Sequence, residues 1–177
     1  MLKTEHYIVI TPRSVVLNGK AIEVNETGSK MLVELYRRYV GDYPKFFKMD
    51  TLCRLGFIAA EILIKESGRS PDAVILANRS ASIKNDTDYL ATISEGNYYP
   101  SPALFVYTLP NIVTGEIAIR QAIQGETAFY ILDQEEQLEP IILSTLHSKR
   151  STVLAGWCEC SKENEFYAKI QLYGTID

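Results

Sequence analysis

Cysteine and histidine are scarce in this chain, which has three cysteines and two histidines among its 177 residues. So sparse and odd a cysteine count argues against a secreted scaffold held by disulfides. Long hydrophobic runs are absent too. No stretch approaches the roughly 18 apolar residues of a membrane-spanning helix, and the N-terminal MLKTEHYIVITPRS holds no run typical of a signal peptide. We therefore expect a cytoplasmic protein without a membrane segment.

An excess of positive charge is also missing, since the net charge is −4 and the sequence pI is about 5.3. The chain as a whole is therefore not expected to bind nucleic acid. The basic pairs Arg37-Arg38 and Lys45 with Lys48 are either solvated faces or contacts for an acidic partner. Hydrophobic residues at 46% and charged residues at 23% are ordinary globular usage, so we expect a single domain over residues 1–177.

Short apolar, β-branched runs predict strands along the chain. Residues 14–17 and 21–24 flank Asn18-Gly19, a pair that tolerates positive φ, so they are expected to form a hairpin. The uninterrupted apolar run at residues 72–77 is typical of a strand buried on both faces of a sheet. Further strands are expected at residues 6–10, 152–155 and 165–173, and before Asp133.

Apolar residues at helical spacing predict two long helices and two short ones. The second long helix is bounded by a capping residue, Asp50, and a stop residue, Gly68. The expected helices cover residues 31–39, 51–66, 88–93 and 135–146, the last divided by Pro140. Helices that alternate with buried strands indicate an α/β fold around a mixed sheet.

Residues 99–134 form the most informative stretch, which is expected to be a loop, a helix of small residues, a turn at Gly125 and a strand ending in Asp133-Gln134. It resembles the segment that precedes the nucleophilic cysteine of β-ketoacyl synthases (3-oxoacyl-acyl-carrier-protein synthases). The residues that carry this resemblance, here and elsewhere in the chain, are Leu109-Pro-Asn111, Gly115, Ile117-Ala-Ile-Arg120, Gly125, Tyr7-Ile-Val-Ile-Thr11, Phe46-Phe-Lys-Met-Asp50 with Ala59-Ala60-Glu61, Gly68 with Pro71-Asp72-Ala-Val, and Thr152-Val-Leu-Ala-Gly156.

The resemblance covers nearly the whole chain but only the first half of a ketosynthase subunit, which is built from two similar halves. It implies a thiolase-like half domain, similar to the N-terminal half of the family, with a mixed sheet of about five strands and helices packed on its faces. The histidines with which the family decarboxylates malonyl groups and binds the thioester oxygen belong to the second half. His6 and His147 do not stand in such a setting, so we interpret both as ordinary surface or hydrogen-bonded histidines.

The place of the family's cysteine falls at Gln134, when residues are counted without gaps from Gly125. A glutamine amide is not a nucleophile and cannot carry an acyl group. At this point the chain resembles chain-length-factor partner subunits and decarboxylating loading domains, which have glutamine here. The carboxylates that follow, Glu135, Glu136 and Glu139, stabilise a helix start by about 0.3–1 kcal/mol each and oppose a thiolate or a malonyl carboxylate. Acyl transfer by this chain alone is therefore not expected.

Five residues are candidates for an acyl pocket or an interface: Phe105, Tyr107, Asn111, Gly115 and Ala118. The two aromatic side chains are either core packing or an apolar wall for an acyl chain. Glycine inside a helix costs about 1 kcal/mol relative to alanine, so Gly115 indicates close approach by another group. That group belongs either to the same subunit or, as the resemblance implies, to a dimer partner or an acyl chain. Asn111 is equally explained as a helix N-cap.

Neither a metal nor a cofactor is expected. Cys158 and Cys160 lie two residues apart at the end of a strand, hence on one face, and without further ligands they are too few for a zinc site. We interpret them as buried or half-buried strand thiols, and Cys53 as a packing residue of its helix.

These observations favour an accessory or partner subunit of fatty-acid or polyketide-type chain synthesis that lacks the nucleophile and the second catalytic half. The alternative is a degenerate 3-oxoacyl-ACP synthase or malonyl decarboxylase that completes its site with a partner chain. A stand-alone scaffold without any acyl connection is the third hypothesis. Because a solitary half leaves large surfaces open, we expect a homodimer or a heterodimer with a full-length ketosynthase, and an acyl carrier protein as a further partner.

Overall fold

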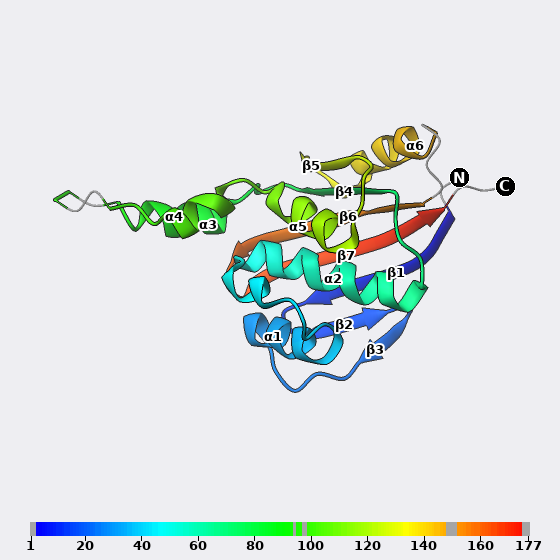
Figure 1. Ribbon diagram of the computed structural model, residues 1–177, viewed down its shortest axis with the longest axis horizontal. Coiled ribbons are helices and arrows are strands. Elements are labelled where there is room, and N and C mark those ends of the chain that lie inside the picture. The colour runs from blue at the N-terminus through cyan, green and yellow to red at the C-terminus, as the bar shows by residue number, and fades with distance from the viewer. Residues whose placement is uncertain (1–2, 94, 97–98, 148–151, 175–177) are drawn as a thin grey trace.

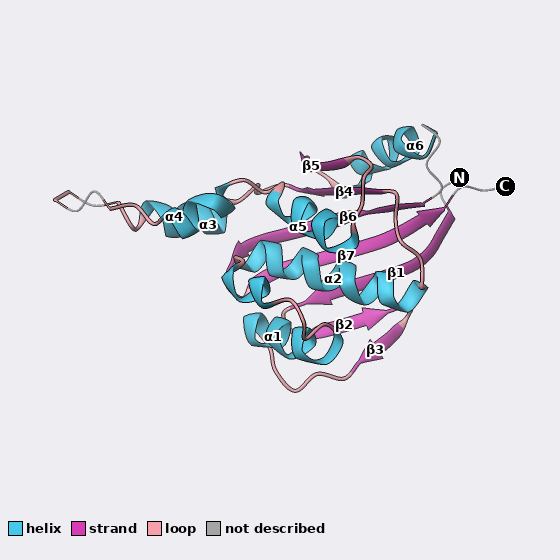
Figure 2. Cartoon of the chain, in the orientation of Figure 1, coloured by secondary structure: helices cyan, strands magenta, loops and turns pink. Residues whose placement is uncertain are grey.

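A computed structural model describes residues 3–93, 95–96, 99–147 and 152–174 of the chain. A seven-stranded sheet runs through the molecule in the order β3-β2-β1-β7-β6-β4-β5. Its strands are β1 (Lys3–Thr11), β2 (Ser14–Leu17), β3 (Lys20–Ile22), β4 (Ala73–Asn78), β5 (Thr127–Ile131), β6 (Thr152–Lys162) and β7 (Glu165–Gly174). β4 pairs in parallel with β5 and β6, whereas the other neighbours are antiparallel, so the sheet is mixed (Figure 2).

The sheet is larger than the expected five or so strands, because the N-terminal hairpin joins it. β2 pairs with β1, with Val16 opposite Val9, and β3 continues the sheet beyond β2. The turn of this hairpin is as predicted, with positive φ at Asn18 and Gly19. The prediction of an α/β fold with a mixed sheet is confirmed, and the predicted number of strands is wrong.

Helices lie on both faces of the sheet (Figure 1). On one face the larger hydrophobic core contains side chains of α1 (Gly28–Tyr39), α2 (Thr51–Ser67) and α5 (Ile112–Gln121). On the other face a smaller core contains side chains of the 3₁₀ helix η3 (Glu135–Leu138) and of α6 (Glu139–His147). The remaining helical segments are η1 (Pro44–Lys48), α3 (Ile83–Leu90), α4 (Pro102–Phe105) and η2 (Val106–Thr108).

α2 is the central helix of the larger core, and its ends are those that the sequence predicts. The Asp50 carboxylate accepts a hydrogen bond from the backbone N–H of Cys53 at 2.9 Å, and Gly68 ends the helix in the left-handed conformation. Leu55, Phe57 and most of its other apolar residues are fully buried, because the helix packs between the sheet, α1 and α5.

The cap of α2 makes the stability of the fold depend on pH. Burial raises the pKa of Asp50 to about 6, whereas an aspartate in an unfolded chain has a pKa of about 3.9. Between these pH values the folded state therefore binds more protons than the unfolded state. The stabilisation of the fold that comes from protonation of Asp50 is fully present below about pH 4 and is lost as the pH rises through about 6. Asp50→Asn keeps a capping oxygen without the charge, so we expect it to raise the free energy of unfolding at pH 7.5 by about 2 kcal/mol.

Urea unfolding at pH 4 and pH 7.5 measures this effect of Asp50→Asn, with Asp50→Ala, which lacks the capping oxygen, as the control. The advantage of the asparagine variant should disappear at pH 4. An asparagine variant less stable than the wild type at pH 7.5 contradicts the assigned burial of the charge.

β6 is longer than the predicted run of residues 152–155. β6 continues to Lys162 because β7 pairs with it along its whole length. Cys158 and Cys160 are buried on one face of this strand in the larger core, as predicted, and Cys53 is buried beside them in α2. Burial raises the pKa of Cys53 and of Cys158 well above the usual range, and that of Cys160 to about 12.

The helix expected at residues 88–93 is wrong in its position. α3 begins at Ile83 and ends at Leu90, within a polar run that gives little apolar periodicity. Its position is set by contacts with a segment some twenty residues later: Asn85 donates a side-chain hydrogen bond to the carbonyl of Leu104 at 2.7 Å, and Ser82 donates one to the carbonyl of Thr108 at 2.8 Å.

Large exposed apolar side chains are concentrated on one part of the molecule. Within the described residues, all of them except Phe47 lie on α3 and the segment after it, on α4 and η2, on α5 or at the end of β5. The outer side of α6, by contrast, exposes Glu139, Pro140 and Ser144. In the described ranges no single helix is long and apolar enough to cross a membrane, although α4 with η2 and α5, bent by 92°, meet the length and composition criteria together.

Candidate functional site

The predicted nucleophile position, Gln134, lies at the carboxyl end of β5, immediately before η3. Its backbone is extended (φ −144°, ψ 147°) and its side chain is exposed. The side-chain oxygen of Gln137 accepts hydrogen bonds from the backbone N–H groups of Asp133 at 2.9 Å and Gln134 at 3.0 Å. Strand, turn and helix start thus occur in the order that the sequence predicts, with an amide side chain at the predicted place.

The carboxylates after Gln134 have separate local roles. Glu135 forms an ion pair with Lys169 of β7 at 2.7 Å, and this contact raises the pKa of Lys169. Glu136 and Glu139 are exposed on the first turns of η3 and α6, where negative charge stabilises the helix start. Together they place negative potential around Gln134.

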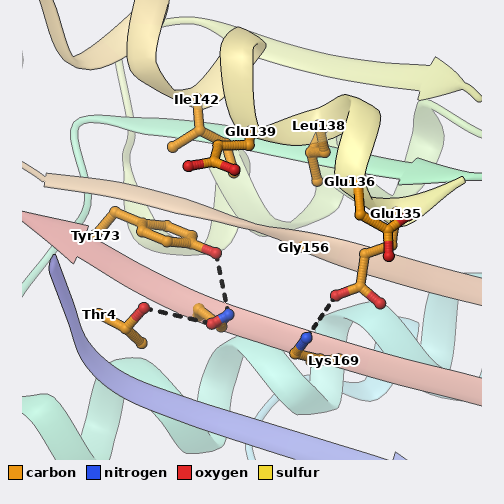
Figure 3. Close-up of a pocket in the computed structure, with 10 residues that line it drawn as sticks. Thr4, Glu135, Glu136, Leu138, Glu139, Ile142, Gly156, Lys169 and Tyr173 are labelled. Atoms are coloured by element: carbon orange, nitrogen blue, oxygen red, sulfur yellow. Dashed lines mark hydrogen bonds and ion pairs between the residues drawn. The ribbon is translucent and has the colours of Figure 1, made fainter. Parts of the chain in front are cut away.

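A cavity of about 300 Å³ lies beside this helix start, between η3 and α6 on one side and strands β1, β6 and β7 on the other (Figure 3). Its wall and floor come from α6 and η3, from β6 and β7 and from the first residues of β1. The residues that line it are Thr4, Glu135, Glu136, Leu138, Glu139, Ile142, Gly156, Lys169, Gln171 and Tyr173. The lining contains three carboxylates and one ammonium group, so its negative charge disfavours an anionic ligand.

The polar side chains on the floor of the cavity are joined by hydrogen bonds (Figure 3). The Gln171 amide donates to the Tyr173 hydroxyl at 3.0 Å, and the Thr4 hydroxyl lies 3.5 Å from the Gln171 side-chain oxygen. Burial, with the carboxylates of Glu135 and Glu139, raises the pKa of Tyr173 to about 12. The phenol is therefore neutral at physiological pH and serves here as a hydrogen-bonding group, not as a base.

Sequence reasoning missed Lys169, Gln171 and Tyr173, which line the cavity beside η3. Their alternation along β7 indicates that they share one face of a strand, but only the pairing of β7 with β6 brings that face beside η3.

The histidines do not complete a catalytic site within the described residues. His6 lies on β1 and its ring Nδ1 is 3.1 Å from the side-chain nitrogen of Asn18, so it is a hydrogen-bonded histidine. His147 ends α6, and its side chain lies outside the described part of the chain. Across the described ranges, no three His, Cys, Asp or Glu side chains are grouped to hold a metal ion.

The five acyl-pocket or interface candidates are not gathered around the cavity. Tyr107 is buried in the larger core, whereas Phe105 and Asn111 are exposed. Gly115 and Ala118 are half-exposed on α5. The Asn111 side chain makes no capping hydrogen bond to α5; its backbone carbonyl accepts from the Thr114 hydroxyl at 2.8 Å instead. The role of these residues in an acyl pocket or an interface stays a prediction.

Gly115 distinguishes packing inside the subunit from packing against a partner. A Cβ added there meets no atom of this chain within 4 Å. Gly115→Ala is therefore expected to stabilise the isolated chain by about 0.5–1 kcal/mol, because alanine is the better helix former. If α5 faces a partner, the same variant weakens the complex.

Thermal unfolding of the isolated Gly115→Ala variant and its affinity for a ketosynthase subunit measure the two effects separately. A lower unfolding temperature contradicts the open surroundings of Gly115. If the affinity of the variant for the ketosynthase subunit is unchanged, Gly115 does not lie in the interface.

No family model and no curated protein matches the sequence. Among solved structures, the chain is similar to a ketosynthase in complex with its chain length factor from Xenorhabdus doucetiae, with 13% identity and a TM-score of 0.70 over 99% of this chain and 79% of that chain. It is also similar to the ishigamide ketosynthase/chain length factor, with 14% identity and a TM-score of 0.69 over 98% of this chain and 62% of that chain. Matches at such low identity show the fold alone: this chain has the fold of the chains that it matches in these two structures.

Proposed function

We propose that this chain is a non-catalytic partner subunit of a ketosynthase in fatty-acid or polyketide-type chain synthesis. The observation that carries the proposal is the exposed amide of Gln134 at the helix start where the family has its nucleophile. An amide there forms no acyl thioester, and Glu135, Glu136 and Glu139 oppose the anionic groups of the reaction. A partner role is supported by the two structural neighbours, whose names describe a ketosynthase together with a chain length factor.

The open edge of the sheet offers a place for the partner. β5 is the last strand and pairs only with β4. The carbonyl of Glu126 accepts a hydrogen bond from Val74 N–H, and Leu132 N–H donates one to the carbonyl of Asn78. The backbone N–H and C=O groups of the even-numbered residues of this strand therefore point toward β4. The backbone groups of Thr127, Phe129 and Ile131 consequently point to the free edge. Such an edge pairs readily with another strand.

The side chains beside that edge are apolar. Ile131 at the end of β5 is 51% exposed and Ile119 of α5 is 68% exposed. Gly115 and Ala118 leave an open strip on the same helix. We assign the partner to this surface, called the β5–α5 surface and made of Gly115, Ala118, Ile119 and residues 127–131.

The alternative function is a degenerate synthase or malonyl decarboxylase that takes its histidines from the partner. Co-expression of this chain, carrying an affinity tag, with the ketosynthase of its own host separates the hypotheses. The partner function predicts a stable complex and no transfer of acyl or malonyl label from a loaded acyl carrier protein to this chain.

The control in this experiment is Gln134→Ala. It should leave both the complex and its turnover unchanged if the chain is non-catalytic. Malonyl decarboxylation that is lost on Gln134→Ala favours the enzyme. If neither a complex nor turnover is observed, the stand-alone scaffold is the remaining hypothesis.

A further inference from the structure

A two-limbed arm projects from the body of the molecule, beyond the covered part of the sheet (Figure 1). We define the arm as residues 83–93 and 99–109. α3 forms the outgoing limb, and α4 with η2 forms the returning limb. The limbs pack on each other: Asn85 donates to the carbonyl of Leu104, and the rings of Tyr89 and Phe105 are 5.6 Å apart.

The base of the arm is fixed to β6 and to the turn after it. The Glu159 carboxylate accepts hydrogen bonds from Arg79 N–H at 2.9 Å and from the Ser80 hydroxyl. Lys84 forms ion pairs with Glu163 and with Asp88, each at 2.7 Å. The arm is therefore held in a defined direction before any partner binds, which lowers the entropy lost on binding.

The arm exposes large apolar side chains along both limbs. Leu90 is 64% exposed and Tyr99 is 86% exposed. Ile83, Phe105, Val106 and Leu109 are also exposed. A monomer surface usually carries exposed apolar side chains singly and scattered. Their concentration on the arm therefore indicates a contact with another molecule.

The charge of the arm and its position favour a protein partner over a lipid surface. The arm contains one basic residue, Lys84, against Asp86 and Asp88, and an anionic membrane surface repels a segment of net negative charge. Its returning limb leads directly into α5 and so joins the arm to the β5–α5 surface.

We propose that the arm clasps the ketosynthase subunit that pairs with the β5–α5 surface, and that its exposed apolar side chains are buried on that subunit. The inference rests on the proposed function, which supplies the partner. It adds that binding depends on residues that lie outside the sheet edge and outside the site around Gln134.

The experiment uses the full chain co-purified with the ketosynthase of its host. The variant is Leu90→Ser with Leu109→Ser, and the control is Phe47→Ser, which alters an exposed apolar side chain away from the arm. We expect the arm variant to weaken the complex at least tenfold in Kd and the control to leave it unchanged, with both chains showing the far-ultraviolet circular dichroism of the wild type.

A cross-link provides a second measurement that does not depend on affinity. Cys53, Cys158 and Cys160 are buried, so the thiol introduced by Leu90→Cys is the accessible one. Labelled there with a maleimide benzophenone, the chain should cross-link to the ketosynthase subunit on irradiation, and the same label on Phe47→Cys should not.

The outcomes separate the inference from the function on which it rests. If the wild-type chain forms no complex, the proposed function fails and the clasp fails with it. If the wild-type complex forms and the arm variant binds as tightly, only the clasp is overturned. Flotation of the wild-type chain, but not of the arm variant, with vesicles of phosphatidylcholine and phosphatidylglycerol overturns the clasp in favour of a lipid surface.

Discussion

Ile131→Glu combined with Ile119→Glu is expected to abolish the association of this chain with a ketosynthase subunit while its fold is retained. Both side chains are exposed in the isolated chain, so the added carboxylates remain in water there and cost little stability. In the complex they are buried without a partner charge, which costs about 2–5 kcal/mol for each. The dissociation constant should therefore rise by more than about a hundredfold.

The matched control is Ala21→Glu on β3, the strand at the opposite edge of the same sheet. It adds one carboxylate to an exposed edge strand and should leave the affinity unchanged. Isothermal titration of each purified variant with the ketosynthase measures the difference. Equal affinities for the two variants place the partner elsewhere on the molecule.

Gly156→Ala is expected to destabilise the fold more than any other single change to a glycine of the sheet. Gly156 lies opposite Ile170 of β7 and Leu76 of β4, in the middle of the sheet. A Cβ there collides with the carbonyl oxygen of Lys169 and lies 2.7 Å from the Cα of Ile170. Since these atoms belong to the backbone of a paired strand, relief requires the two strands to separate. We expect a loss of about 3 kcal/mol or more.

In a domain of this size the loss lowers the unfolding temperature by roughly 10 °C. Differential scanning calorimetry measures it, with Gly115→Ala as the control because that glycine has open space around it. Equal unfolding temperatures for Gly156→Ala and the wild type contradict the close approach of the strands. The cavity beside Gln134 has Gly156 in its lining, so the same variant also tests how the sheet shapes the cavity.

The elements that the sequence predicts well are those with strong local signals. α2 has a capping aspartate, a long apolar pattern and a stop glycine, and its bounds agree with the prediction within a residue. The hairpin of β2 and β3 depends on Asn18-Gly19, whose positive φ values are local properties of that pair. Such signals act over a few residues and need no tertiary contact.

The elements that sequence reasoning misplaced depend on distant contacts. α3 is a polar helix held in place by side-chain hydrogen bonds to the carbonyls of Leu104 and Thr108. The second part of β6 becomes a strand because β7 pairs with it. Neither contact leaves a periodic pattern within its own segment.

The candidate site also has some features that local sequence predicts and others that depend on distant contacts. The position of Gln134 at the end of a strand and the start of a helix follows from local sequence and from the resemblance. The ion pair of Glu135 with Lys169, the buried Tyr173 and the cavity between them arise from sheet topology, which joins residues far apart in the chain. Phe105 of the arm and Gly115 and Ala118 of the β5–α5 surface are interface candidates in the sequence. The extent of either surface could not be predicted, because an apolar residue in a sequence does not show whether its own chain covers it.

We propose that this chain acts by pairing with a ketosynthase through the β5–α5 surface. Light scattering after size-exclusion chromatography of the co-expressed proteins measures this pairing. We expect a single species whose mass is the 20.0 kDa of this chain plus that of the ketosynthase subunits, and we expect the Ile119→Glu, Ile131→Glu variant to lose it. A wild-type chain that elutes as a 20.0 kDa monomer, apart from the ketosynthase at micromolar concentration, contradicts it.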